Sequence, residues 1–165
     1  MLGRIVIVTL VAGACSSPAP EPQRPAPRTS IARRELPPEI TALVPAHGVY
    51  LAGGGDKSDV FRVVVDTDAK TIYTGKAAPG TALHSKLTDE HTRELTPRNE
   101  AHLMRLCAAA WAEPAPATQP DPVAGYDEFL VIADGDELFF LQGHGPIKRP
   151  KAISAIEALR AAAAL

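Results

Sequence analysis

Apolar and polar residues follow two different periods along this chain, and the period of each segment predicts its secondary structure. Alternation with a period of two, which is typical of strands, places Phe61, Val63 and Val65 on one side of residues 60–65. Runs that favour turns, such as the glycines at 53–55, separate this segment from its neighbours. The pattern predicts an antiparallel meander of three strands, at residues 47–52, 60–65 and 71–74.

A second pair of strands is predicted further along the chain by two apolar runs around a turn. Residues 128–133 and 137–141 flank the segment Asp134-Gly135-Asp136. An Asp-Gly pair readily adopts the positive φ angles of a tight hairpin turn. Both faces of this hairpin are apolar, so we expect the sheet to be covered on both sides or buried against a partner.

The other period is the 3.6-residue repeat of amphipathic helices. Thr96 followed by Pro97 supplies a capping residue and a proline at the first helical position. An apolar stripe that includes Trp111 then runs as far as Pro114, and a second stripe follows Pro150. We expect Trp111 to lie in the core.

Together these elements predict an α+β fold in the order three strands, helix, two strands, helix (βββ-α-ββ-α). The expected architecture is a twisted antiparallel sheet of about five strands with two helices packed on it. This single globular domain is expected to span residues 39–165.

The N-terminal segment has a different composition. Arg4 and the apolar stretch 5–8 precede the segment 10–15, which reads LVAGAC. A short positive head, a brief hydrophobic run and small residues before a cleavage point are typical of a secretory signal peptide. The run is too short to span a bilayer, which takes about 20 apolar residues.

Because a cysteine directly follows the small residues, residues 1–17 resemble the signal segment of bacterial lipoproteins. The resemblance implies cleavage of a signal peptide at 1–14 and a lipid on the thiol of Cys15. Acyl chains anchor a protein by about 0.8 kcal/mol per buried methylene. Since Ser16 rather than an aspartate follows Cys15, the resemblance implies the outer membrane, facing the periplasm. A plain secretion signal that ends at Ala14 and releases a soluble protein is the alternative.

Residues 15–38 are rich in proline, which fixes φ and removes hydrogen-bond donors. We expect a disordered, extended tether between the lipidated Cys15 and the globular domain. Arginines make this tether basic, which suits solvation and would also allow contact with anionic lipid or cell-wall polymer.

Charge and cysteine content narrow the function further. The net charge of −2 over 165 residues argues against a nucleic-acid partner. If Cys15 carries lipid, Cys107 has no partner for an internal disulfide. The place of Cys107 on the apolar helix stripe predicts a buried, unreactive thiol.

Candidate catalytic chemistry is sparse. His84 and His91 flank Asp89 and Glu90 in a polar segment, and His144 stands between glycines after the second hairpin. Such groups can serve acid–base catalysis or bind metal. Neither a nucleophile elbow nor zinc-ligand spacing accompanies them, so we predict no catalytic residue, no metal and no cofactor.

The sequence therefore favours a lipid-anchored cell-envelope protein that acts as a non-catalytic binding module. Its expected partners are the membrane, through Cys15, and an envelope protein or cell-wall component. The alternative is a periplasmic enzyme or a metal-dependent activity that uses the segments around His84, His91 and His144.

Overall fold

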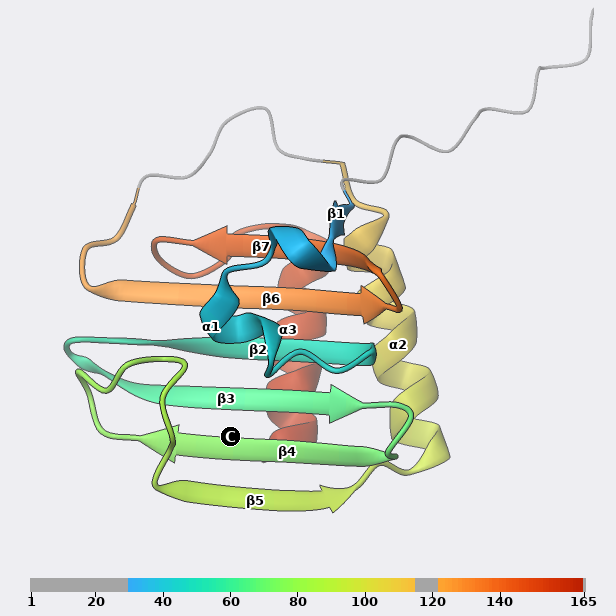
Figure 1. The fold of residues 1–165 in the computed structure, drawn as a ribbon, viewed down its shortest axis with the longest axis horizontal. Helices are drawn as coiled ribbons and strands as arrows, with labels where there is room; N and C mark the ends of the chain where they lie inside the picture. Colours follow the sequence, from blue (N-terminus) through green and yellow to red (C-terminus); the bar gives the residue numbers. More distant parts are fainter. Residues whose placement is uncertain (1–29, 115–121, 165) are drawn as a thin grey trace, which may run out of the picture.

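The computed structural model describes residues 30–114 and 122–164, which form one antiparallel sheet and three α-helices (Figure 1). The seven strands lie in the order β1-β7-β6-β2-β3-β4-β5. The strands are β1 (Ile31–Ala32), β2 (His47–Gly55), β3 (Ser58–Asp66), β4 (Thr71–Ala77), β5 (Asp89–Glu94), β6 (Tyr126–Asp134) and β7 (Glu137–Gly143). The helices are the 3₁₀ turn η1 (Arg33–Glu35), α1 (Pro38–Thr41), α2 (Pro97–Trp111) and α3 (Pro150–Ala163).

The α+β class is as predicted, and so are the two long helices, the meander β2–β3–β4 and the hairpin β6–β7. The expected number of about five strands was wrong, because β1 and β5 were not foreseen. All six side chains of β5 are exposed and none is a large apolar residue, so the strand has no buried face to create an alternating pattern. Charged side chains are usual on an exposed edge strand, where they discourage pairing with other chains.

The folded part begins earlier than the expected boundary at residue 39. Strand β1 pairs with β7, and the Arg33 guanidinium donates to the carbonyl oxygens of Val44 and Pro45 at 2.9 and 2.6 Å. The proline-rich composition concealed this, because a two-residue edge strand carries no periodic signal. The predicted signal peptide at 1–14, and Cys15 with the tether as far as residue 29, lie outside the described residues.

The middle of the sheet is buried on both faces, as the apolar hairpin predicted. On one face α2 and α3 lie side by side behind the sheet in the view of Figure 1. They cover a core that includes Leu51, Leu130, Phe139, Leu103 and Leu159. On the other face η1, α1 and the turns around them cover a second core, which includes Leu36, Ile40, Tyr50, Val131 and Leu138. Much of the second face is therefore covered by this chain's own N-terminal segment.

The glycine run at 53–55 extends strand β2 instead of forming the expected turn, which lies at residues 56–57. Gly54 has a φ of 151°, and a Cβ there would lie 2.7 Å from the Cα of Val60. A Cβ on Gly55 would lie 1.7 Å from the carbonyl oxygen of Gly125. Glycine is required here because two neighbouring backbones approach the end of β2 closely.

An ion pair between a buried carboxylate and a half-buried arginine ties α3 to the sheet. Glu128 on β6 is 2% exposed, and its carboxylate accepts hydrogen bonds from Arg160 at 2.9 Å and from the backbone N–H of Ile147 at 2.7 Å. The Arg160 guanidinium also lies 4.3 Å from the centre of the Phe61 ring. A buried carboxylate is tolerated when its oxygens are paired in this way.

Among the helices of the described residues, none has the length and apolarity that a membrane crossing takes.

The burial of Trp111 gives a first test of this fold. Trp111 is 8% exposed and stacks on Phe139, with ring centres 6.2 Å apart. We expect Trp111→Ala to lower the free energy of unfolding by about 3–5 kcal/mol, through lost burial and the cavity left behind. Urea denaturation followed by circular dichroism measures this. Trp111→Phe, which keeps a ring on Phe139, should cost clearly less, and a loss below about 1 kcal/mol for Trp111→Ala would contradict the packing.

Candidate functional site

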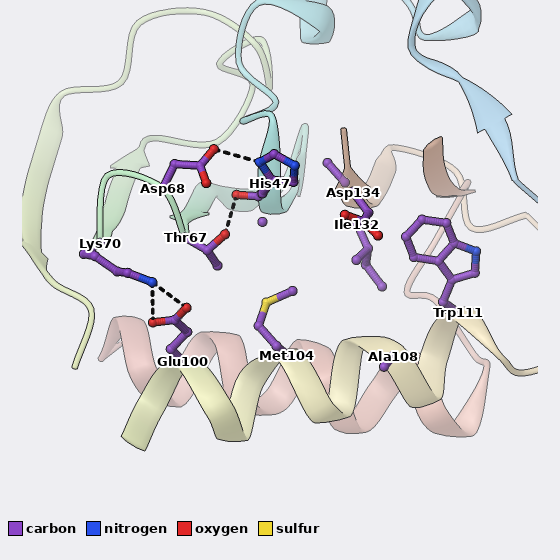
Figure 2. A pocket seen from close by; sticks show the side chains of 12 residues that line it. His47, Thr67, Asp68, Lys70, Glu100, Met104, Ala108, Trp111, Ile132 and Asp134 are labelled. Atoms are coloured by element: carbon purple, nitrogen blue, oxygen red, sulfur yellow. Dashed lines mark hydrogen bonds and ion pairs between the residues drawn. The ribbon is translucent and has the colours of Figure 1, made fainter. Parts of the chain in front are cut away.

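A cleft of about 600 Å³ opens between α2 and one end of the sheet. Its sheet side comes from the start of β2, the turn between β3 and β4, and the end of β6. Its other side is one face of α2, which runs beneath these strand ends in Figure 2. Cavities of this size accommodate small ligands or single side chains of a partner.

The floor of the cleft is apolar. Met104, Ala108 and Trp111 follow one another at helical spacing and so share one face of α2. Ile132 of β6 completes the floor from the sheet side. Met104 is half-buried and Ala108 is exposed, so part of this apolar surface faces solvent.

The turn between β3 and β4 positions the polar rim. The carboxylate of Asp66 accepts hydrogen bonds from the backbone N–H groups of Asp68 and Ala69 at 2.9 and 2.8 Å, which is the Asx-turn arrangement. The Thr67 hydroxyl donates to the backbone carbonyl of His47 at 3.0 Å and so ties the turn to β2. These bonds hold the Asp68 side chain beside the His47 ring.

Two charge pairs line the rim (Figure 2). His47 Nδ1 lies 2.8 Å from an Asp68 carboxylate oxygen. Across the cleft, Lys70 Nζ lies 2.7 and 2.9 Å from the two carboxylate oxygens of Glu100. The second pair connects the turn to α2 and closes one end of the cleft.

Asp68 makes His47 easier to protonate. The hydrogen bond to Asp68 and the charge of that carboxylate raise the pKa of His47 above its usual 6.5, and Asp134 adds to the rise. Desolvation and the Arg33 guanidinium oppose it more weakly. His47 is therefore more basic than an isolated imidazole.

Asp134 stands on the rim without such a pair. It lies at the end of β6, before the hairpin turn in which Gly135 has a φ of 63°. Within residues 30–114 and 122–164, no side chain or backbone N–H forms a hydrogen bond or ion pair with the exposed Asp134 carboxylate. Figure 2 shows Asp134 beside Ile132, between His47 and Trp111.

The histidines predicted from the sequence as alternative catalytic groups have separate partners. His91 on β5 pairs with Asp89, and His144 after β7 pairs with Asp127, each at 2.8 Å. Neither these two histidines nor His84, the third candidate, lines the cleft. In the described part of the chain, no group of three or more His, Cys, Asp or Glu side chains is arranged to hold a metal ion.

His84 lies on the face of the sheet opposite to α2. Its Nδ1 shares a hydrogen bond of 2.8 Å with the Tyr50 hydroxyl, and its ring meets Phe129 edge-on. The buried Arg62 fixes the segment around it by donating to the carbonyl oxygens of Leu83 and Ser85, each at 2.7 Å. Burial and the charge of Arg62 lower the pKa of His84, so its environment favours the neutral ring.

Cys107 is buried on α2, as its place on the apolar stripe predicted. Burial raises the pKa of its thiol to about 12, which leaves no reactive thiolate at neutral pH.

Sequence reasoning missed the cleft because its residues fit other interpretations. His47 and Asp68 were assigned to a strand and a turn, and Trp111 to the core. The available signal was the helical spacing of Met104, Ala108 and Trp111, which lies beside the stripe of Leu103, Cys107 and Ala110 that packs on the sheet. An apolar face wider than one stripe indicates a second contact surface.

No family model, no curated protein and no solved structure matches this chain.

Two histidines should shape the pH dependence of stability in opposite directions. The pKa of His84 is lowered in the folded state, so its contribution to stability is lost as pH falls below 6.5. The pKa of His47 is raised in the folded state. Its contribution to stability is therefore complete below pH 6.5 and is lost as the pH rises through the raised pKa.

Urea denaturation between about pH 5 and pH 8 measures both effects. We expect His84→Gln to flatten the stability profile on the acid side of 6.5 and His47→Gln to flatten it on the alkaline side. A His84→Gln profile that still falls below pH 6.5 as steeply as that of the unmodified protein would contradict the assignment.

Proposed function

We propose that this protein is a lipid-anchored protein of the bacterial cell envelope, and that its domain is a non-catalytic binding module whose ligand occupies the cleft beside α2. One observation carries the second part of this proposal. The chain covers both faces in the middle of its own sheet, whereas the half-buried Met104 and the exposed Ala108 leave part of the cleft floor open to solvent beside the buried Trp111. Apolar surface at the base of a concave site is where binding energy is gained.

The location of the protein is proposed from the sequence alone. The resemblance of residues 1–17 to a lipoprotein signal supports lipid attachment at Cys15, and Ser16 supports the outer membrane. A membrane-bound module of this kind would meet an envelope protein or a cell-wall component.

We favour binding over catalysis because of how the titratable groups are distributed. The alternative based on His84, His91 and His144 has little geometric support, since each ring is paired in a different part of the fold. In the cleft, the Thr67 hydroxyl is bonded to a backbone carbonyl and Lys70 is paired with Glu100. Neither side chain forms a hydrogen bond with the His47 ring, as an activated nucleophile would.

In-cell photocrosslinking tests the binding site directly. A photoreactive amino acid replaces Ala108, which lines the cleft, or Ala109, which is equally exposed on α2 but does not line it. Both variants are made in the full-length precursor with a C-terminal tag. We expect a discrete adduct from position 108 and none from position 109.

The same experiment with Cys15→Ala tests the anchor. If the partner lies in the membrane or at its surface, the adduct from position 108 should fall when the lipid is not attached. Equal crosslinking from positions 108 and 109, or none from position 108, would overturn the cleft as the binding site. Both positions are exposed, so unchanged thermal unfolding of the two variants is the control for folding.

A further inference from the structure

The cleft holds an unbalanced negative charge. Of the three carboxylates on its rim, Glu100 is paired with Lys70 and Asp68 with His47. Asp134 is the third, and in the described part of the chain it has no such partner. Whenever His47 is neutral, the rim carries more negative than positive charge.

Arg33, whose charge acts on His47, does not line the cleft. Its guanidinium donates to the carbonyl oxygens of Val44, Pro45 and, at 3.4 Å, Gly135. It is therefore held by backbone carbonyls rather than by a carboxylate of the rim.

The position of Asp134 constrains what the cleft can bind. A ligand that covers Ile132 and Trp111 also approaches Asp134, which lies between them and His47 in Figure 2. Removing water from an unpaired carboxylate is unfavourable unless the ligand supplies a donor or a positive charge. A neutral or anionic apolar ligand would meet that cost without compensation.

We propose that the cleft binds a positively charged group carried on an apolar stem, an alkylammonium or alkylguanidinium. Asp134 and Asp68 hold the cation, and the stem packs on Met104 and Trp111. This inference rests on the proposed function, because it names the ligand chemistry of the same cleft. Either a small amine or a lysine or arginine side chain of a polypeptide supplies this chemistry.

The proton on His47 competes with such a ligand. His47 faces Asp68 from the β3–β4 turn, Asp134 from β6 and Arg33 from η1, with Lys70 and Glu100 further along the rim. When His47 is protonated, its charge offsets the two aspartates that would hold the cation. The affinity for a cation should therefore rise as pH increases through the pKa of His47.

Tryptophan fluorescence reports on the base of the cleft, because Trp111 is the one tryptophan in the chain and it lines the cleft. The full chain is used with Cys15→Ala, so that no lipid or detergent interferes with amphiphilic probes. Hexylamine, 1-hexanol and hexanoate are titrated as cationic, neutral and anionic probes, each with six carbon atoms. We expect a saturable change with hexylamine, weaker binding of hexanol by about tenfold, and no saturation with hexanoate.

Asp134→Asn should weaken hexylamine binding by about two- to fivefold. Asp136→Asn, a change at an equally exposed position in the same hairpin turn, should leave hexylamine binding unaltered.

Binding of hexylamine by the unmodified site should be tighter at pH 8 than at pH 6, and His47→Gln should remove this pH dependence. A short acetylated peptide with lysine between two leucines tests whether the cation comes from a polypeptide. If it does, this peptide should bind more tightly than hexylamine, and the same peptide with glutamate in place of lysine should not bind.

The outcomes separate this inference from the proposed function. Equal affinity for hexylamine and hexanol, unaffected by Asp134→Asn, would overturn the preference for cations while leaving the cleft as a binding site. If no probe changes the fluorescence but position 108 still crosslinks in cells, the cationic ligand is wrong and the binding module stands.

Discussion

The two-sided burial of strands β2 and β6 is the constraint on which the rest of this structure depends. Between Gly48 and Gly54 every residue of β2 is buried, and the same holds from Glu128 to Ala133 on β6. A sheet of this kind needs cover on both faces. Helices α2 and α3 supply it on one side, and η1 with α1 contributes it on the other.

This requirement explains the polar contacts that anchor the covering elements. Glu128 and Arg160 fix α3 to the sheet through a largely buried ion pair. At the N-terminus of α3, the Glu113 carboxylate accepts from the backbone N–H of Lys151 at 3.2 Å, where a negative charge is favourable to the helix. On the second face Arg62 holds residues 83–85 over Tyr50. Each of these contacts positions an element that packs on the sheet rather than a ligand.

The cleft is where the cover is incomplete. Leu103, Cys107 and Ala110 direct α2 onto the sheet, so the neighbouring face of the helix, with Met104 and Ala108, is turned toward the ends of β2 and β6. The β3–β4 turn closes one end through Lys70 and Glu100. The binding surface thus arises from the way that α2 packs, with its charges supplied by two turns of the sheet.

The sequence was sufficient for the elements that bury a face. The alternation in residues 60–65 and the capping pair Thr96-Pro97 led to β3 and α2, and Asp134-Gly135 led to the hairpin β6–β7. Elements without a buried face could not be found in this way, because β5 is exposed along its whole length and β1 contains two residues. The glycines at 53–55 indicated a turn. In the structure they are needed because neighbouring backbone segments lie close to the end of β2, which only the tertiary structure reveals.

The candidate site was beyond the sequence for a related reason. Its members come from four segments, and neither the pairing of His47 with Asp68 nor the isolation of Asp134 depends on spacing along the chain. From the sequence alone, the histidines and the apolar stripe of the helix could be identified as separate features. Only the fold brings such residues together into a cleft with a charged rim.

The most direct test of the central claim, that the floor of the cleft is a binding surface, uses the methyl group of Met104. Met104 is the one methionine of the described residues and it lines the cleft, so a spectrum of ¹³C-methyl-labelled methionine has one signal from the cleft, which Met104→Leu identifies by its loss. The full chain with Cys15→Ala is titrated with hexylamine. The account predicts that the Met104 signal shifts and saturates, and that intermolecular NOEs link the Met104 methyl group to the hexyl stem. A Met104 signal that does not move under conditions where hexylamine binds elsewhere would contradict it.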